Sequence, residues 1–344
     1  MESQSPTSNV VYSGAGLYFL FVIIQAGIKK EANPQISQLL SQSLSKFIDE
    51  PIWGQTDTSM TTTFIQNLIK SASKFESALF HSCRIKKHFR ELSDEFLGLE
   101  FRKIMFLNIS SAKILIRGWI QSKLSGKGTK IFGRRLEPDT LIVYISILVF
   151  YRAWLTSFDV KSTKRELFYI GNGQESTVLM MNKISPYPIL DDSSIDVRII
   201  FLPFTGIGLF GAIILPRKGH SLRETSQSFR QVHLKLPRFT ILSKHRYIDA
   251  FIHLNISDEF FKNIANLIGI KNSDGLINKF FQITDITIDE NGARTPFNWI
   301  SHLENRRTPE PKAFFVNRSF LFLVYSSYSK LVLYAAAVMN PSAF

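Results

Sequence analysis

An almost unbroken apolar run, TLIVYISILVF at residues 140–150, constrains the fold of this 344-residue chain more than any other segment. A strand with one face in water alternates apolar and polar side chains, whereas a strand covered on both faces reads as a continuous apolar run. The run is too short to span a membrane as a helix, and it stops at Arg152. The sequence therefore predicts a β-strand that is buried on both faces.

Helical signals lie in the first part of the chain and strand signals in the second. Helices are predicted at residues 15–27, 33–48, 56–74 and 110–128, and segment 94–106 mixes both patterns. Strands are predicted at 140–154, 166–184, 196–204, 209–216, 231–242, 278–290 and 319–341, with one helical interval at 257–270. This order predicts an α+β fold. Since no linker interrupts the chain, we expect one domain over 1–344, mainly helical in 1–137 and mainly β in 138–344.

Two motifs in the strand-rich part affect how its strands are interpreted. GIGLFG at 206–211 matches the glycine pattern of dinucleotide sites, but such a site needs a helix that opens from the turn. The chain continues instead as AIILP, so we interpret the motif as a hairpin turn. Pro237, within the strand at 231–242, has no N–H to donate and predicts a bulge or an edge position.

The residue types that carry catalysis do not form a catalytic or metal-binding pattern. The seven histidines include no pair at metal-ligand spacing, and the sequence has no nucleophile-elbow, phosphate-loop or zinc motif. The single cysteine, Cys83, excludes an intramolecular disulfide. We therefore expect no enzyme activity, no metal and no cofactor. Sequons at Asn108, Asn255 and Asn317 matter only for a secreted chain, and the N-terminus has no signal-peptide pattern.

The chain is basic, because 41 lysines and arginines face 28 acidic residues and leave a net charge of +13. This balance favours anionic partners such as sulfated polysaccharide, nucleic acid or an acidic membrane. Only Phe89 and Phe132 accompany the basic residues, so stacked single-stranded nucleic acid is disfavoured. We predict a site for sulfated polysaccharide; the alternative is a solvated charge run. Its candidate residues are Arg84, Lys86, Lys87, Arg90, Lys123, Lys127, Lys130, Arg134 and Arg135.

The order of segments resembles the serpin family of serine protease inhibitors. Residues 136–159 are similar to the family's stretch in which a strand leads to a tryptophan, here Trp154. Residues 162–184 are similar to the hairpin that follows, with paired methionines at Met180 and Met181. Further similarities are IIFLPF to AIILP at 199–216, LPRF at 236–239, IDENGA at 288–293 and VNRSFLFLV to VMNP at 316–341.

This resemblance implies a serpin fold of three β-sheets, with about eight or nine helices and an exposed reactive loop, here residues 292–312. It implies a monomer that inhibits a serine protease outside the cell; a cytoplasmic location is the alternative. The similarity begins close to residue 9, so a counterpart of the family's first long helix is not expected in these residues; either the chain is shortened or its true start lies upstream.

In inhibitory serpins the reactive loop is cleaved and then inserts as a new strand into the large sheet. The resemblance places the scissile bond near Arg306, Arg307 and Thr308. An arginine there would suit a trypsin-like protease, whose specificity pocket carries a carboxylate. The alternative is that the two arginines form only an exposed basic pair.

The hinge at the start of the loop departs from the family pattern. The resemblance assigns the hinge to Glu290, Gly292, Ala293, Arg294, Thr295 and Pro296. Inserting strands of the family carry small residues after the glycine, whereas Phe297 and Trp299 are bulky, and overpacking costs about 1–3 kcal/mol per site. Pro296 would also remove a hydrogen bond in the middle of the sheet. A non-inhibitory serpin, which is a protease substrate or binds polyanions, is therefore the alternative.

The resemblance also assigns residues that control the opening of the large sheet. They are Ser13, Ser146, Trp154 and Gln282. Ser146 stands where the family carries an asparagine, and Gln282 stands where it carries a histidine. Ser13 begins Ser-Gly-Ala-Gly in place of the family's Ser-Pro-x-Ser. These changes predict an altered control region.

Overall fold

The computed structural model describes residues 8–27, 58–126, 136, 140–170, 174–191, 196–206, 208–217, 227–247, 279–293 and 310–343. The chain forms two compact units. The first unit comprises residues 1–13, 150–243 and 285–344, and the second comprises 14–149 and 244–284. Each unit draws on separate stretches of the sequence. The expectation of one domain over 1–344 stays a prediction.

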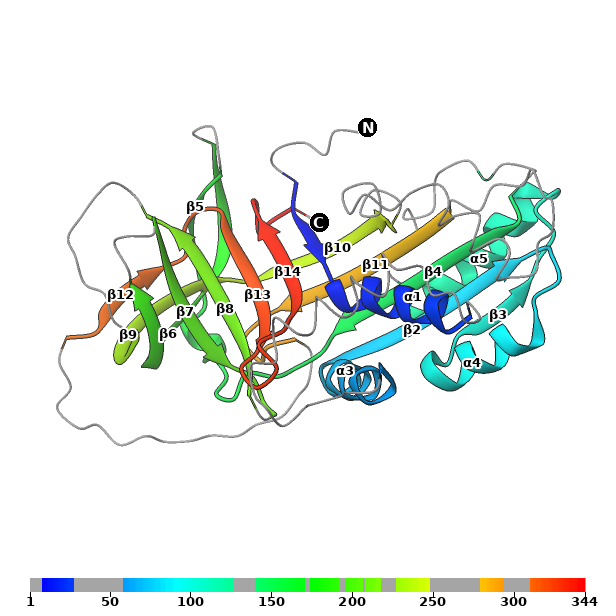
Figure 1. Ribbon diagram of the computed structural model, residues 1–344. Helices are drawn as coiled ribbons and strands as arrows, with labels where there is room; N and C mark the ends of the chain where they lie inside the picture. The colour runs from blue at the N-terminus through cyan, green and yellow to red at the C-terminus, as the bar shows by residue number, and fades with distance from the viewer. Residues whose placement is uncertain are drawn as a thin grey trace. The chain divides into compact units, whose positions relative to one another are not determined.

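A nine-stranded sheet forms most of the first unit (Figure 1). Its strands are β1 (Val10–Tyr12), β5 (Lys164–Tyr169), β6 (Glu175–Asp191), β7 (Val197–Pro203), β8 (Leu209–Pro216), β9 (Gln227–Pro237), β12 (Lys312–Phe315), β13 (Phe320–Ser326) and β14 (Val332–Val338). Their order is β1-β14-β13-β8-β7-β6-β9-β12, and β5 pairs with β6 beside this path. β12 runs parallel to β9, whereas the other pairs are antiparallel. A 3-10 helix, η2 (Val160–Ser162), precedes β5.

The second unit combines helices with part of a five-stranded sheet. Its described elements are α1 (Gly14–Gly27), α3 (Thr58–Ala72), β2 (Ser73–His81), α4 (Lys87–Leu97), β3 (Glu100–Lys103), α5 (Ile109–Lys123) and nearly all of β4 (Ile142–Phe150). The sheet has the order β10-β11-β4-β2-β3. Strands β10 (Phe239–Arg246) and β11 (Lys279–Ile288) each continue from one unit into the other.

Strand β4 shows how the apolar run at 140–150 determines the architecture. Every residue of β4 except Val149 is buried, and β11 and β2 are its neighbours in the sheet. Burying a valine, leucine, isoleucine or phenylalanine side chain stabilises a fold by about 1.5–3 kcal/mol. The prediction of a strand buried on both faces is therefore confirmed.

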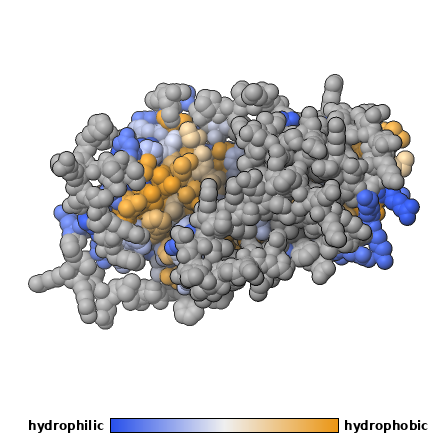
Figure 2. Space-filling model, in the orientation of Figure 1, coloured by the Kyte–Doolittle hydropathy of each residue, from blue (hydrophilic) through white to orange (hydrophobic). Residues whose placement is uncertain are grey.

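Aromatic side chains fill the core of the first unit. Phe239 meets Phe320 and Phe322 edge-on, with ring centroids 5.8 and 5.4 Å apart. Phe150 contacts Phe204 at 5.1 Å and Tyr334 at 5.4 Å. Such ring pairs add about 0.5–1.5 kcal/mol each to the free energy of burial. In the view of Figure 2, some hydrophobic residues also form a patch on the visible surface.

Most predicted elements are confirmed within the described residues. The helices at 15–27, 56–74 and 110–128 correspond to α1, α3 and α5, and the side chain of Asn108 caps α5 by accepting a hydrogen bond from Ser111 N at 3.0 Å. GIGLFG leads into strand β8 and not into a helix, as its interpretation as a hairpin turn requires. The helices expected at 33–48 and 257–270 lie outside the described residues. No described helix has both the length and the hydrophobicity to cross a membrane.

The prediction of one continuous strand at 231–242 was wrong, because β9 ends at Pro237 and β10 begins at Phe239 in the other sheet. Pro237 pairs with Met180 of β6 on one side and lies beyond Lys235, the last residue of β9 that pairs with β12, so its edge position is confirmed. The backbone N–H of Arg238, between β9 and β10, donates to Leu179 O at 2.9 Å. Because proline donates no hydrogen bond, it suits the point where the chain leaves one sheet for the other.

Two differences concern strands. Strand β2 was not predicted, because it begins at Ser73 directly after α3 ends at Ala72, without a turn signal. The described strands also form two sheets where three were expected. The reason is β6, whose 17 residues pair with β5 at the start, with β9 along most of the length and with β7 at the end.

Candidate functional site at the hinge

The chain leaves β11 through a tight turn that ends at Gly292. Asn291 N donates to Asp289 Oδ1 at 2.9 Å, and Asp289 and Gly292 exchange two backbone hydrogen bonds of 2.9 and 3.1 Å. Gly292 has φ +109°, which residues with a side chain rarely adopt. A Cβ there would lie 2.5 Å from Arg152 O and 2.6 Å from Trp154 N. Both the backbone angle and the available space therefore require glycine.

The segment that follows β4 holds this turn in place. Trp154 N donates to Asn291 O at 2.9 Å, and Trp154 Nε1 donates to Asp289 O at 3.0 Å. Ala293 N donates to Arg152 O at 2.6 Å. We call residues 152–154 together with 289–293 the hinge clamp. Its hydrogen bonds fix the backbone on both sides of Gly292.

Packing of the Trp154 ring positions the clamp. The ring stacks on Phe204 with centroids 4.3 Å apart and planes inclined by 7°, and it meets Phe158 edge-on at 6.2 Å. All three side chains are buried. The indole N–H would be costly to bury without a partner, and Asp289 O provides one. Trp154 therefore anchors the hinge through both its ring and its N–H.

Glu290 is the buried carboxylate of the clamp. Thr163 Oγ1 donates to its Oε1 at 2.7 Å, and Phe158 N donates to its backbone carbonyl at 2.8 Å. Arg238 Nε lies 3.6 Å from Oε2, with the arginine side chain 42% exposed. A buried carboxylate needs such partners, so Thr163 and Arg238 hold Glu290 at the end of the turn. Neither partner was predicted from the sequence.

The chain beyond residues 294–309 is anchored at β12. Lys312 Nζ lies 2.5 Å from Asp191 Oδ2, and Arg198 donates to Ala313 O at 2.9 Å. Arg217 also donates to Asp191. Burial alone would raise the pKa of Asp191, but the three cations outweigh it and the pKa is lowered. Both ends of the predicted loop are therefore tied into the first unit.

Two of the predicted control residues meet through a tyrosine in the second unit. Ser146 Oγ, on β4, lies 2.9 Å from Tyr247 OH, and Gln282 Nε2, on β11, donates to the same hydroxyl at 3.1 Å. Burial raises the pKa of Tyr247, so its hydroxyl stays protonated. A Cβ on Gly16 would lie 2.2 Å from Gln282 Nε2, so α1 approaches this cluster closely. Tyr247 carries no sequence signal that would have singled it out.

Ser13 and Trp154 belong to the first unit. Ser13 is buried, and its hydroxyl donates to Leu333 O at 2.8 Å, on β14. Trp154 lies in the hinge clamp. The four predicted control residues thus divide between Ser146 and Gln282 in one unit and Ser13 and Trp154 in the other.

Lys123, a predicted polyanion-binding residue, lies between two carboxylates. Its Nζ is 2.8 Å from Glu76 Oε2 and 2.7 Å from Glu100 Oε1, and its side chain is 21% exposed. Arg102 also pairs with Glu100, at 2.7 Å. The charge of Lys123 is therefore neutralised within the protein, which weakens its assignment to a polyanion site.

The other described members of the basic set lie at the start of α4 and just before it. Arg84, Lys86, Lys87 and Arg90 are exposed. Lys87 forms an exposed ion pair with Glu91 at 3.4 Å, which is of little energetic value. The guanidinium of Arg90 lies 4.9 Å from the centroid of the Phe101 ring. These side chains are accessible to an anion, in contrast to Lys123.

The remaining predicted site residues lie outside the described residues. They are Lys127, Lys130, Arg134 and Arg135 of the basic set, Arg294, Thr295 and Pro296 of the hinge, and Arg306, Arg307 and Thr308 of the scissile region. Within the described part of the chain, no group of three side chains has the composition and spacing to hold a metal ion. The hinge clamp holds a backbone turn directly after β11, where the predicted loop begins.

Comparison with known proteins identifies the family and the fold. The family model "Serpin (serine protease inhibitor)" matches residues 1–341. The chain is 23% identical to human Serpin I2 over 363 residues, which covers 98% of this chain and 88% of that protein. The structure of mouse protein-Z dependent protease inhibitor superposes with a TM-score of 0.78 at 22% identity, covering 97% of this chain and 91% of that one. Human thyroxine-binding globulin gives a TM-score of 0.77 at 19% identity, covering 98% and 94%.

The chain belongs to the serpin family, and its α+β fold is the serpin fold. The structural neighbours include, by name, a protease inhibitor and a thyroxine-binding globulin. The fold alone therefore does not decide between inhibition and another function. The family as a whole supports a function in protease inhibition.

Proposed function

We propose that this protein engages a trypsin-like serine protease through residues 292–312, which it offers as a bait loop cleaved next to Arg306 or Arg307. The hinge clamp carries this proposal. It fixes the chain at Gly292, where β11 ends, and the Lys312–Asp191 ion pair fixes the chain again at β12. An intervening segment with two arginines suits a protease whose pocket carries a carboxylate.

The chemistry of the encounter belongs to the protease. Its serine oxygen attacks the carbonyl carbon of the arginine before the scissile bond, the peptide bond breaks, and the new amine leaves with a proton. The loop remains attached to the serine as an ester. Inhibition then requires insertion of the loop into the sheet before water hydrolyses that ester.

Insertion has to separate β4 from β11, which are neighbours in the five-stranded sheet. The polar cluster of Ser146, Tyr247 and Gln282 links these strands within the second unit, and its hydrogen bonds have to rearrange for the strands to part. Pro296, Phe297 and Trp299 oppose insertion for the reasons given by the sequence. We therefore propose slow insertion, so that cleavage as a substrate competes with inhibition.

The experiment combines the protein with trypsin and reads three quantities: a denaturant-resistant covalent complex, the position of cleavage by mass spectrometry, and the melting temperature after cleavage. The matched control is the double variant R306Q/R307Q. Cleavage within residues 306–308 of the natural protein, absent from the control, supports the bait loop. Absence of cleavage there contradicts it.

The same measurements distinguish inhibition from substrate behaviour. A covalent complex with a large rise in melting temperature identifies an inhibitor. Loop cleavage with neither result identifies a non-inhibitory serpin. An extracellular location fits a target protease of this kind and stays a proposal, which secretion of the full-length protein from cells would test.

A second candidate function, polyanion binding, is favoured by the exposed side chains of Arg84, Lys86, Lys87 and Arg90. They lie together at the start of α4, and the net charge of +13 would draw an anionic polymer to the protein. Sulfated polysaccharide is the proposed partner.

A further inference from the structure

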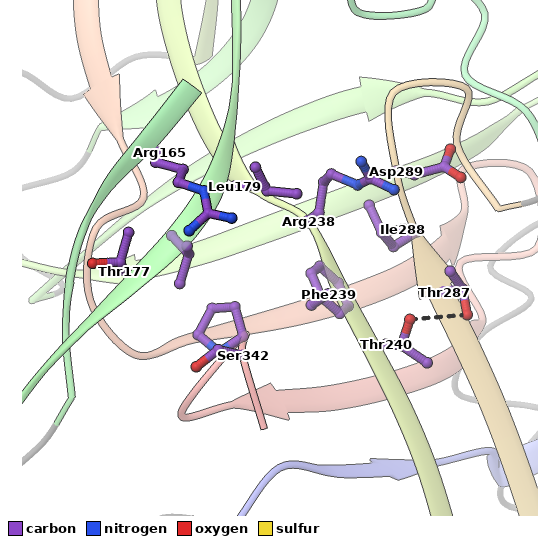
Figure 3. A pocket seen from close by; sticks show the side chains of 12 residues that line it. Arg165, Thr177, Leu179, Arg238, Phe239, Thr240, Thr287, Ile288, Asp289 and Ser342 are labelled. Atoms are coloured by element: carbon purple, nitrogen blue, oxygen red, sulfur yellow. Dashed lines mark hydrogen bonds between the residues drawn. The ribbon is translucent and has the colours of Figure 1, made fainter. Parts of the chain in front are cut away.

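A pocket of about 290 Å³ opens in the first unit, between β5, β6, the start of β10, the end of β11 and residues 341–342 (Figure 3). Its volume is at the lower end of the range of about 300–1,000 Å³ that is typical of small-molecule sites. All residues that line it belong to the first unit. The protease-directed loop does not require such a pocket, so its use needs a separate explanation.

The pocket has an apolar interior. Val178, Phe239 and Ile288 line it, but their side chains are almost completely buried already, whereas Leu179 adds an aliphatic side chain that is 41% exposed. Thr240 Oγ1, also in the lining, donates to Thr287 Oγ1 at 3.3 Å. The exposed side chain of Leu179 favours an apolar ligand body, because burying apolar surface is favourable at about 25 cal/mol per Å².

Two arginines supply the polar contacts. Figure 3 shows Arg165 and Arg238 among the lining side chains, with Leu179 between them. Arg238 is already oriented by Glu290, whose Oε2 lies 3.6 Å from its Nε. Within the described residues no acidic side chain forms an ion pair with Arg165. Guanidinium groups match a carboxylate geometrically, because they present parallel N–H donors.

The acidic residue in the lining does not cancel this preference. Asp289 takes part in the hinge turn, where its Oδ1 accepts a hydrogen bond from Asn291 N at 2.9 Å. In Figure 3 it lies on the far side of Arg238 from Arg165. The guanidinium of Arg238 therefore lies between Asp289 and a ligand anion bound at Arg165.

We propose that this pocket binds a small amphipathic carboxylate, with the acid group on Arg165 and the aromatic or aliphatic body against Leu179. No residue of the pocket lining belongs to residues 292–312, so the binding test does not require cleavage of the bait loop. Arg238 joins it to the hinge, since the same side chain lines the pocket and pairs with Glu290.

Isothermal titration of the full chain with 2-naphthoate tests the proposal, and 2-naphthalenemethanol serves as the uncharged analogue. Arg165→Gln should weaken naphthoate binding by about tenfold or more, because a charge-assisted hydrogen bond is lost. Lys164→Gln is the matched control: it removes the same charge from the adjacent position of β5, whose side chain faces the other side of the strand. Its affinity for naphthoate should equal that of the natural protein.

Leu179→Glu provides a second variant that retains both arginines. A carboxylate at this exposed position should repel naphthoate and weaken its binding, with little effect on the melting temperature. Absence of naphthoate binding at millimolar concentration would overturn the proposal. Equal binding of the alcohol and the acid, or unchanged affinity in Arg165→Gln, would overturn it as well.

Discussion

At the scale of single residues, Gly292 and Glu290 give the hinge its two distinct requirements. Gly292 provides a backbone conformation, and Glu290 provides a buried carboxylate with two partners. The first requirement is steric and admits no other residue without movement of the Arg152–Trp154 segment. The second is electrostatic, and its value depends on Thr163 and Arg238 being in place.

Gly292→Ala should lower the free energy of unfolding by about 2–4 kcal/mol, because φ is positive and the new Cβ would meet backbone atoms at 2.5–2.6 Å. Chemical denaturation measures the change. Gly118→Ala is the control: a Cβ there meets nothing within 4 Å, and alanine within helix α5 should stabilise by about 0.5–1 kcal/mol. Equal effects of the two substitutions would contradict the steric role of Gly292.

At the scale of elements, β12 is held by charge as well as by its pairing with β9. Asp191 at the end of β6 meets Lys312, Arg198 and Arg217, and its side chain is only 14% exposed. A partly buried carboxylate among three cations is difficult to remove, because the cations are left unpaired. The ion cluster therefore stabilises the strand that receives the chain after the loop.

Asp191→Asn should lower the free energy of unfolding at pH 7 by about 1–3 kcal/mol. The pKa of Asp191 is lowered in the folded state, so its contribution is present above the unfolded pKa of about 3.9 and is lost as the pH falls through the folded value. The difference between the natural protein and the variant should therefore shrink in acid. Urea denaturation at pH 7 and pH 3 measures it, and a difference that stays constant would contradict this assignment.

The start of α4 is the element at which polyanion binding can be tested. Lys86→Ala/Lys87→Ala should elute from heparin at lower NaCl concentration than the natural protein, because two exposed cations are lost. Lys161→Ala/Lys164→Ala, also exposed, is the control for total charge and should elute later than the α4 variant. Equal retention of both variants would show that the interaction reflects net charge alone.

At the scale of the whole molecule, inhibition by a serpin depends on adding the cleaved reactive loop to an existing β-sheet as a new strand. Here β4 and β11 are neighbours in the five-stranded sheet, so a loop that inserted between them would have to displace their mutual hydrogen bonds. The inserting segment must supply backbone donors along its length and side chains small enough to pack. Residues 293–299 meet these requirements only in part.

Pro296→Thr/Phe297→Ala/Trp299→Ala should increase the fraction of trypsin captured as covalent complex and the rise in melting temperature after cleavage. The substitutions restore one backbone donor and remove two bulky side chains, each worth about 1–3 kcal/mol of overpacking. Arg294→Ala is the control, because that side chain would face outward and should change neither quantity. Equal complex formation by both variants would contradict the role assigned to this segment.

Much of the fold could be predicted from local patterns. The apolar run of β4, the hairpin of β5 and β6, and the helices α1, α3 and α5 follow from spacing and end signals. Strand β2 was missed because it follows α3 without a break, and the change of sheet at Pro237 was read as an irregularity within one strand. In both cases the missing information was the pairing partner of the strand, which lies far away in the sequence and which a local pattern does not identify.

The sequence by itself determined most of the described helices and strands, and the resemblance to serpins predicted the hinge at Gly292. The tertiary structure decided the contacts that make the hinge a clamp: Trp154 with Asp289, and Thr163 with Glu290. It also decided that Tyr247 joins Ser146 to Gln282 and that Lys123 is neutralised by Glu76 and Glu100. Secondary structure depends on neighbours a few residues apart, whereas these contacts join residues far apart along the chain and exist only where the sheets bring them together.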